Sequence, residues 1–145
     1  MSMTLKQQVD YWLSGANESL LDMRAAIRSG RRANGLFCGH LALEKMLKAV
    51  CAVRLVPIDK IWGHKLHILA KEAGIKLSNS QLNELLTITT FNIEARYSSR
   101  KEQFKAICTP QYVKQWSQVI EQWCKELKEC VLNERALLPN KKRVN

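Results

Sequence analysis

The sequence predicts an all-α protein, folded as an up-and-down antiparallel bundle of about five helices, four long and one short. Three observations support this class: only six glycines and three prolines interrupt the chain, β-branched runs are scarce, and apolar residues recur every three or four positions. With 145 residues, 46 % of them apolar, the chain has the length and composition of one globular domain. We therefore expect a single domain over residues 1–135 and a basic flexible tail over residues 136–145.

The first predicted helix runs from about Leu5 to Ser29. Thr4 followed by Gln7 fits a capping box, and Gly30 suits the position after the last turn. The apolar stripe of this helix consists of Leu5, Val9, Trp12, Leu13, Ala16, Leu20, Met23 and Ile27. One side of the helix should therefore lie on a core.

The second predicted helix, from about Arg32 to Leu55, is apolar nearly all round, so we expect neighbours to cover it on several sides. A polar row, His40, Glu44 and Lys48, crosses this surface at intervals of four residues. Successive members of such a row turn by only about 40° around the axis, so all three side chains can face one groove. Lys45 is expected to point away from that groove.

A short helix is predicted over residues 64–74, and a longer one starts at Ser78, where Gln81 completes a second capping box. The apolar stripe of the longer helix consists of Leu82, Leu85, Leu86, Thr89 and Ile93. Projected onward, Arg96 falls on the same stripe and faces inward. A guanidinium in that position needs a carboxylate, a carbonyl or a wet cleft.

The polar and basic segment 98–108 is expected to be a loop. Thr109 as a cap and Pro110 in the first turn predict the start of the last helix, which should end near Arg135. Its apolar stripe consists of Val113, Trp116, Ile120, Trp123, Cys124, Leu127 and Val131. Short connections between long amphipathic helices favour an antiparallel bundle.

The composition limits the classes of function. The formal net charge of +10 favours an acidic partner, such as a nucleic acid, a nucleotide or an acidic protein surface. We expect no membrane span, because no apolar run is long enough, and the first residues do not resemble a secretory signal. The five cysteines form no CxxC pair, which favours a cytoplasmic location. Cys51 and Cys124 fit core positions, and no Cys or His pair has the spacing of a metal site.

Three segments together resemble the HEPN family, named for higher eukaryotes and prokaryotes nucleotide-binding. They are LFCGHLALEKMLKAV at 36–50, GHKLHILAKEAG at 63–74 and NIEARYSS at 92–99. In that family the fourth helix typically closes on an Ala-Arg-Tyr-Pro motif; Arg96 and Tyr97 match it, and Ser98 stands in place of the proline. The resemblance covers about residues 5–130.

The resemblance implies a helical module that forms a homodimer and binds a nucleotide such as ATP or GTP, or is the partner of a minimal nucleotidyltransferase in a toxin–antitoxin pair. Another branch of the family cleaves RNA with an Arg-x(4–6)-His motif. No arginine of this chain has a histidine five to seven residues downstream. The sequence therefore argues against catalysis, and a rearranged site is the remaining alternative.

Two interpretations remain open for the polar row of the second helix. His40, Glu44 and Lys48 are either an internal ion-pair row or one wall of a cleft between the second and fourth helices. In such a cleft Lys48 would meet a phosphate and His40 would form a hydrogen bond with the ligand.

Two interpretations also remain for the residues at the end of the fourth helix and at the start of the third. Arg96 either pairs with Glu44 while Tyr97 covers the end of the bundle, or it binds an anion, for which a guanidinium suits phosphate geometry. His64 and His67 either cap their short helix or contribute to the ligand site.

Two further groups of residues are notable. An arginine cluster near the first turn is either a solvated corner or a nucleic-acid contact; it consists of Arg24, Arg28, Arg31 and Arg32. Three tryptophans, Trp12, Trp116 and Trp123, fall on apolar stripes and should pack in the core. Trp62 lies in a loop beside Gly63 and marks either a dimer face or the lip of a pocket.

The leading hypothesis is a cytoplasmic, dimeric, non-catalytic HEPN-type module. Its predicted ligand residues are Arg96, Tyr97, His40, Glu44, Lys48 and His64, with no metal and no certain cofactor. The first alternative is an RNA-cleaving toxin with a displaced site formed by His40 and Arg96. The second is a structural module that uses its dimer face and basic surface to hold an acidic protein.

Overall fold

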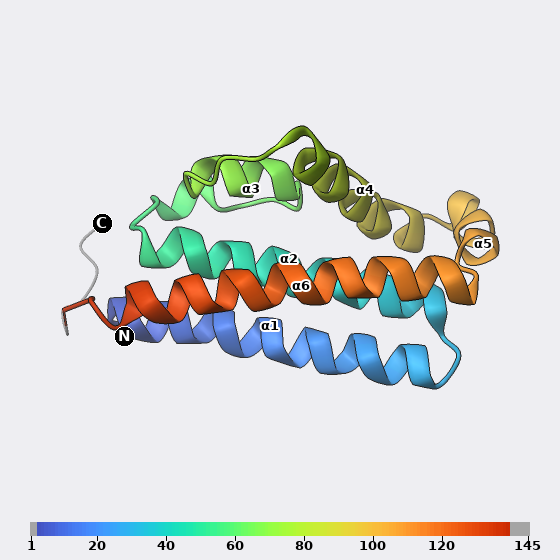
Figure 1. The fold of residues 1–145 in the computed structure, drawn as a ribbon, viewed down its shortest axis with the longest axis horizontal. Coiled ribbons are helices and arrows are strands. Elements are labelled where there is room, and N and C mark those ends of the chain that lie inside the picture. Colours follow the sequence, from blue (N-terminus) through green and yellow to red (C-terminus); the bar gives the residue numbers. More distant parts are fainter. Residues whose placement is uncertain (1–2, 140–145) are drawn as a thin grey trace.

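The computed structural model describes residues 3–139, and the secondary-structure elements within that range are all helices. The elements are α1 (Leu5–Arg28), α2 (Arg32–Val53), a 3₁₀ turn η1 (Ile58–Lys60), α3 (Leu66–Glu72), α4 (Asn79–Arg96), α5 (Ser98–Ile107) and α6 (Pro110–Arg135). The predicted all-helical bundle is confirmed, with one helix more than expected (Figure 1).

The starts of three helices follow directly from local sequence. The hydroxyl of Thr4 accepts a hydrogen bond from the backbone N–H of Gln7 at 3.1 Å. Ser78 does the same for Gln81 at 3.1 Å, so both predicted capping boxes form. Thr109 caps α6 in the same way. These caps satisfy amides that a helix leaves without an intrahelical partner.

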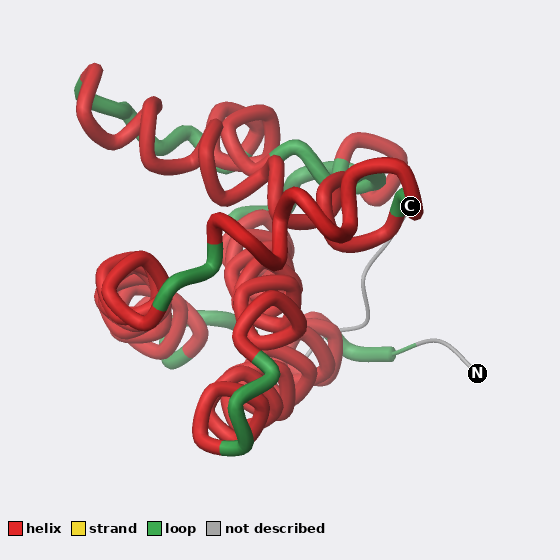
Figure 2. The backbone as a smooth tube through the Cα atoms, turned by 90° about the vertical axis from the view of Figure 1, so that its right-hand side faces the viewer, coloured by secondary structure: helices red, strands yellow, loops and turns green. Residues whose placement is uncertain are grey.

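Helix α2 is the centre of the bundle. It contacts each of the other five α-helices, and its apolar residues from Leu36 to Val53 are mostly buried. Figure 1 shows α2 between α1 on one side and α3 and α4 on the other. Figure 2, turned by 90°, shows α6 beside the pair of α1 and α2. The prediction that neighbours cover this helix on several sides is therefore confirmed.

Helices α2 and α6 run in the same direction. At the start of α2, Nε of Arg32 donates to the carbonyl of Cys108, 2.7 Å away, just before α6 begins. Beyond the end of α2, Nε of Arg54 donates to Glu134 at 2.9 Å, near the end of α6. This parallel pairing is possible because α3, α4 and α5 return the chain to the starting end of α2.

The prediction of a loop over residues 98–108 is wrong, because this segment forms α5. Its sequence, SSRKEQFKAI, contains residues of good helix propensity. Phe104 is its single buried side chain, 2 % exposed, and its ring centre lies 5.6 Å from that of Phe91. One buried residue makes no apolar period, so the pattern carried no helical signal.

The helix α4 is confirmed, but of the stripe predicted for it only Leu85 is fully buried. The buried residues of α4 are Leu85, Ile88, Phe91 and Asn92, while Leu86 and Ile93 are 41 % and 43 % exposed. Apolar residues occur on both sides of α4, so periodicity alone could not choose the buried side. Phe91 decides the orientation, because its ring fits against Tyr112 and Trp116 of α6.

Helix α6 ends at Arg135, as predicted, and most of the predicted tail over residues 136–145 is not described. Leu138 still packs against the core, whereas residues 140–145 lie outside the described part of the chain. None of the helices within residues 3–139 is long and apolar enough to cross a membrane.

Candidate functional site

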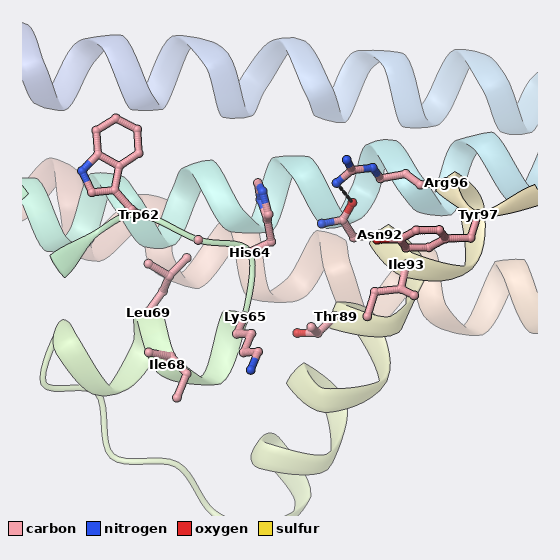
Figure 3. Close-up of a pocket in the computed structure, with 11 residues that line it drawn as sticks. Trp62, His64, Lys65, Ile68, Leu69, Thr89, Asn92, Ile93, Arg96 and Tyr97 are labelled. Carbon is pink, nitrogen blue, oxygen red and sulfur yellow. Dashed lines mark hydrogen bonds between the residues drawn. The ribbon is translucent and has the colours of Figure 1, made fainter. Parts of the chain in front are cut away.

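A pocket of about 380 Å³ lies between the loop before α3, α3 itself and the C-terminal half of α4. We call it the α3–α4 pocket. It is lined by Trp62, Gly63, His64, Lys65, Ile68, Leu69, Thr89, Asn92, Ile93, Arg96 and Tyr97 (Figure 3). The structure thus brings three of the predicted ligand residues, Arg96, Tyr97 and His64, to one pocket.

The other three predicted ligand residues form a buried polar cluster on α2. His40, Glu44 and Lys48 are 0 %, 5 % and 6 % exposed and do not line the pocket. Nζ of Lys48 donates to Oε2 of Glu44 at 3.2 Å and lies 5.2 Å from the centre of the Trp12 ring. The pocket therefore lies between α3 and α4 and not, as expected, between the second and fourth helices. Lys45 points away from the row, as predicted, because it donates to Ser19 of α1.

His64 connects the pocket to this cluster. Its Nδ1 lies 2.8 Å from Oε1 of Glu44, and its backbone carbonyl lies 3.0 Å from Nε2 of His40. A carboxylate and a carbonyl can only accept, so Nδ1 of His64 and Nε2 of His40 both carry a proton. Half of the His64 side chain, 56 %, stays exposed. His64 is thus held at its ring and at its backbone while one edge of the ring remains accessible.

His40 is a neutral, structural histidine. Desolvation by burial is the largest influence on its pKa and lowers it below the ordinary value of 6.5, because the imidazolium form loses its hydration. The carbonyl of His64 and the carboxylate of Glu44 oppose this shift. Its Nδ1 is buried without a hydrogen-bond partner within the described chain. His40 therefore cannot reach a ligand in the pocket, and the displaced site proposed from His40 and Arg96 is not formed.

Arg96 lies on the exposed side of α4 rather than on the inward stripe that was predicted for it. Its contact in the described structure is a long hydrogen bond of 3.5 Å from Nη1 to Oδ1 of Asn92. Glu44 is already taken by Lys48 and His64, so the pairing of Arg96 with Glu44 does not occur. Figure 3 shows His64 and Arg96 extending toward α2 from different ends of the pocket. The guanidinium of Arg96 is therefore available to a ligand.

The remaining wall of the pocket is mainly apolar and partly aromatic. Trp62 is 77 % exposed and lines the pocket, which was one of the two positions expected for it. Tyr97 is 59 % exposed, and Ile68 and Ile93 are both 43 % exposed. Asn92 also lines the pocket but was not among the predicted ligand residues; its position four residues before Arg96, one helical turn away, was the available sequence signal. The other three tryptophans pack in or against the core, as predicted.

The cysteines do not build a reactive or metal-binding site. All five are free thiols, and Cys51 and Cys124 are buried as predicted. Burial raises the pKa of Cys51 to about 11 and that of Cys124 to about 12, because a buried thiolate loses its hydration. Both thiols are therefore protonated at neutral pH. Residues 3–139 contain no group of three or more His, Cys, Asp or Glu side chains that could hold a metal ion.

A comparison with models of protein families agrees with this architecture. The model of the HEPN domain matches residues 9–130, which is most of the chain. The chain therefore belongs to the HEPN domain family. No curated protein and no solved structure matches it.

Proposed function

We propose that this protein is a non-catalytic HEPN module that binds a nucleotide in the α3–α4 pocket. The observation that carries the proposal is the guanidinium of Arg96, which no carboxylate in the described structure neutralises, at the edge of a mainly apolar pocket. Such a site offers charged donors for a phosphate group and apolar surface for a base.

The pocket offers a binding partner for the phosphate of a nucleotide and another for its base. Arg96 can present its guanidinium donors to a phosphate, because its own hydrogen bond to Asn92 is long. The rings of Trp62 and Tyr97 are exposed at the pocket and can stack on a purine base. His64 can donate or accept at its free ring edge. The buried cluster of α2 then acts indirectly, since Glu44 fixes the orientation of His64.

Isothermal titration calorimetry with ATP and with GTP tests the proposal. Arg96→Ala should weaken binding by about 1–3 kcal/mol, the cost of losing a hydrogen bond to a charged group. Arg100→Ala is the matched control, because Arg100 pairs with Glu94 at 3.0 Å and does not line the pocket. No binding of either nucleotide, or an equal loss in both variants, would contradict the proposal.

Family membership supports two further expectations, the dimer and the nucleotidyltransferase partner, and the cysteine content supports a third, the cytoplasmic location. We propose that the protein forms a homodimer, resides in the cytoplasm and pairs with a minimal nucleotidyltransferase. Analytical ultracentrifugation of the pure protein tests the dimer. Co-expression with the nucleotidyltransferase of a neighbouring gene, followed by purification through a tag on one chain, tests the partnership. Recovery of the tagged chain alone would contradict it.

One observation favours a second candidate function, the cleavage of RNA. His64 and Arg96 line the same pocket, and the contact of Nδ1 with Glu44 leaves Nε2 as the acceptor nitrogen of the neutral His64 ring. His64 could then take the proton from a ribose 2′-hydroxyl as the 2′-oxygen attacks phosphorus. The bond from phosphorus to the 5′-oxygen breaks, water protonates the leaving oxygen, and Arg96 stabilises the phosphorane charge.

Incubation with total RNA decides this second candidate. If it is correct, the wild-type protein cleaves RNA, His64→Ala abolishes the cleavage and His67→Ala, outside the pocket, does not. Intact RNA in the presence of the wild-type protein would exclude it.

A further inference from the structure

A second pocket lies where the turn between α1 and α2 meets the junction of α5 and α6. It has a volume of about 400 Å³. It is lined by Gly30, Arg31, Arg32, Ala33, Asn34, Lys105 and Cys108, and we call it the Arg31–Lys105 pocket. Three of these residues are cationic and none is acidic. It shares no lining residue with the α3–α4 pocket.

The three cations have few partners of their own. Nε of Arg32 donates to the carbonyl of Cys108 at 2.7 Å, which fixes the guanidinium and leaves its terminal nitrogens unused within the described structure. Within residues 3–139, the side chain of Arg31 forms a hydrogen bond only with the hydroxyl of Ser29, at 3.4 Å. Lys105 contacts Glu102 at 3.4 Å, and this pair is weak because both side chains are more than half exposed. The pocket therefore keeps most of its positive charge.

Not every arginine of the predicted cluster behaves in this way. Arg24 forms two hydrogen bonds of 2.7 Å with the carboxylate of Glu121 and is neutralised by it. The structure thus divides the cluster. Arg24 belongs to a surface ion pair, whereas Arg31 and Arg32 line the Arg31–Lys105 pocket, which no carboxylate lines.

We infer that the Arg31–Lys105 pocket binds a phosphate group in the backbone of a single-stranded nucleic acid. Guanidinium groups match the geometry of phosphate oxygens, and a fixed guanidinium such as that of Arg32 loses little entropy on binding. Lys101 lies one turn before Lys105 on the same side of α5, and Arg28 is exposed just before the turn. These cations continue the positive surface beyond the pocket. A strand with several phosphates fits this arrangement better than a single anion.

Fluorescence anisotropy with the whole chain and a labelled single-stranded RNA of about ten nucleotides tests the inference. The test variant is Arg31→Ala/Lys105→Ala, whose two side chains are exposed and outside the core. The control Lys71→Ala/Lys125→Ala removes the same charge from α3 and α6, away from the pocket. Circular dichroism verifies that both variants are folded.

The test variant should bind about tenfold more weakly than the wild type, and the slope of log affinity against log salt should fall by about 0.7 for each phosphate that the variant no longer neutralises. Arg31→Lys should retain part of the affinity because it keeps the charge without the planar group. The control pair should retain wild-type affinity. Equal weakening of the test and control pairs would overturn the inference, because it would show binding by net charge alone.

Two further measurements distinguish a strand at this pocket from a free anion and from a strand elsewhere on the protein. Inorganic phosphate that binds at the pocket while RNA does not bind would overturn the assignment to a nucleic-acid strand. Arg96→Ala should weaken RNA binding less than the test variant does, since Arg96 lies in the other pocket. A loss in Arg96→Ala as large as in the test variant would place the strand at the α3–α4 pocket instead. Nucleotide binding there can fail in calorimetry without changing these outcomes.

Discussion

The imidazole of His64 donates from Nδ1 to Oε1 of Glu44 over 2.8 Å, and this bond joins a loop at a pocket wall to the buried centre of α2. The same carboxylate receives Nζ of Lys48 at 3.2 Å through its other oxygen. Glu44 thus serves two basic side chains at once, one half-exposed and one buried. Its removal should affect both the fold and the pocket.

Replacement of Glu44 tests the buried cluster. Glu44→Gln leaves the ammonium of Lys48, 6 % exposed, without its carboxylate, and should lower the free energy of unfolding by about 3 kcal/mol. Urea denaturation measures this loss. The double variant Glu44→Gln/Lys48→Met should recover most of it, because it removes the unpaired charge as well. A double variant no more stable than Glu44→Gln would contradict this account.

The buried His40 predicts a pH dependence of stability. Its pKa in the folded state is lowered below 6.5, chiefly by desolvation, so the unfolded chain binds a proton more readily than the folded one. The stability is therefore complete above about pH 6.5 and decreases as the pH falls below that value. Glu44, His64 and Lys48 are the charged or titratable groups that influence this ring.

Urea unfolding between pH 7.5 and pH 5.5 (about one unit on either side of the ordinary histidine value) measures the effect. The variant His40→Gln can still donate to the carbonyl of His64 but cannot titrate. Its stability should change less over this interval than that of the wild type. An equal pH dependence in both proteins would assign the effect to other groups.

Arg54 joins three elements and should matter more than a surface arginine. Its guanidinium donates to Glu134 of α6 at 2.9 Å and to the carbonyl of Ala73, which ends α3, at 2.7 Å. Arg54→Ala should cost about 2 kcal/mol, whereas Arg24→Ala, which loses only the exposed pair with Glu121, should cost about 0.5 kcal/mol. Thermal or chemical unfolding compares them. Equal costs would show that the Ala73 carbonyl contributes nothing.

Helix α5 should depend on a single side chain. Phe104→Ala removes about 3 kcal/mol of packing, and a helix of ten residues without other buried groups is not stable alone. Hydrogen exchange should therefore show loss of protection over Ser98–Ile107 while α2 and α6 stay protected. Ile107→Ala, at a residue 51 % exposed, is the control and should change little.

A glycine should be tolerated, and even preferred, just after α2. Leu55 has a φ of 62°, a left-handed conformation that costs a side-chain-bearing residue about 1–2 kcal/mol. Its side chain is 55 % exposed, so little packing is lost on truncation. Leu55→Gly should raise the unfolding free energy by about 0.5–1 kcal/mol, after the entropy of the more flexible unfolded chain is subtracted. Leu55→Ala keeps the strain and should bring no gain.

The sequence predicted those helices whose starts and buried faces are marked by residues close together in the chain. Capping residues set the starts of α1, α4 and α6, and one-sided apolar stripes identified the buried faces of α1 and α6. The orientation of α4 could not be predicted in this way, because it depends on where the ring of Phe91 fits between α5 and α6. That is a tertiary contact, which periodicity does not contain.

Three of the six predicted ligand residues, Arg96, Tyr97 and His64, line the α3–α4 pocket, and the other three lie in the buried cluster of α2. The polar row of α2 and the pair Arg96-Tyr97 were identified from spacing and family motifs, but the hydrogen bonds decide which of them meet. Glu44 binds His64 and not Arg96, because His64 approaches it from the loop before α3. The direction of that loop follows from η1 and the chain around it, for which the sequence offers only Pro57 as a signal.

Helix α5 connects the two pockets. Tyr97, the residue before its first turn, lines the α3–α4 pocket, while Lys105 and Cys108 at its other end line the Arg31–Lys105 pocket. The ten residues of α5 form a helix about 15 Å long between the α3–α4 pocket and the Arg31–Lys105 pocket. Phe104 is the buried side chain that holds this helix on the rest of the bundle. The two pockets therefore share one connecting helix, and a rigid tilt of α5 would move Tyr97 and Lys105 together.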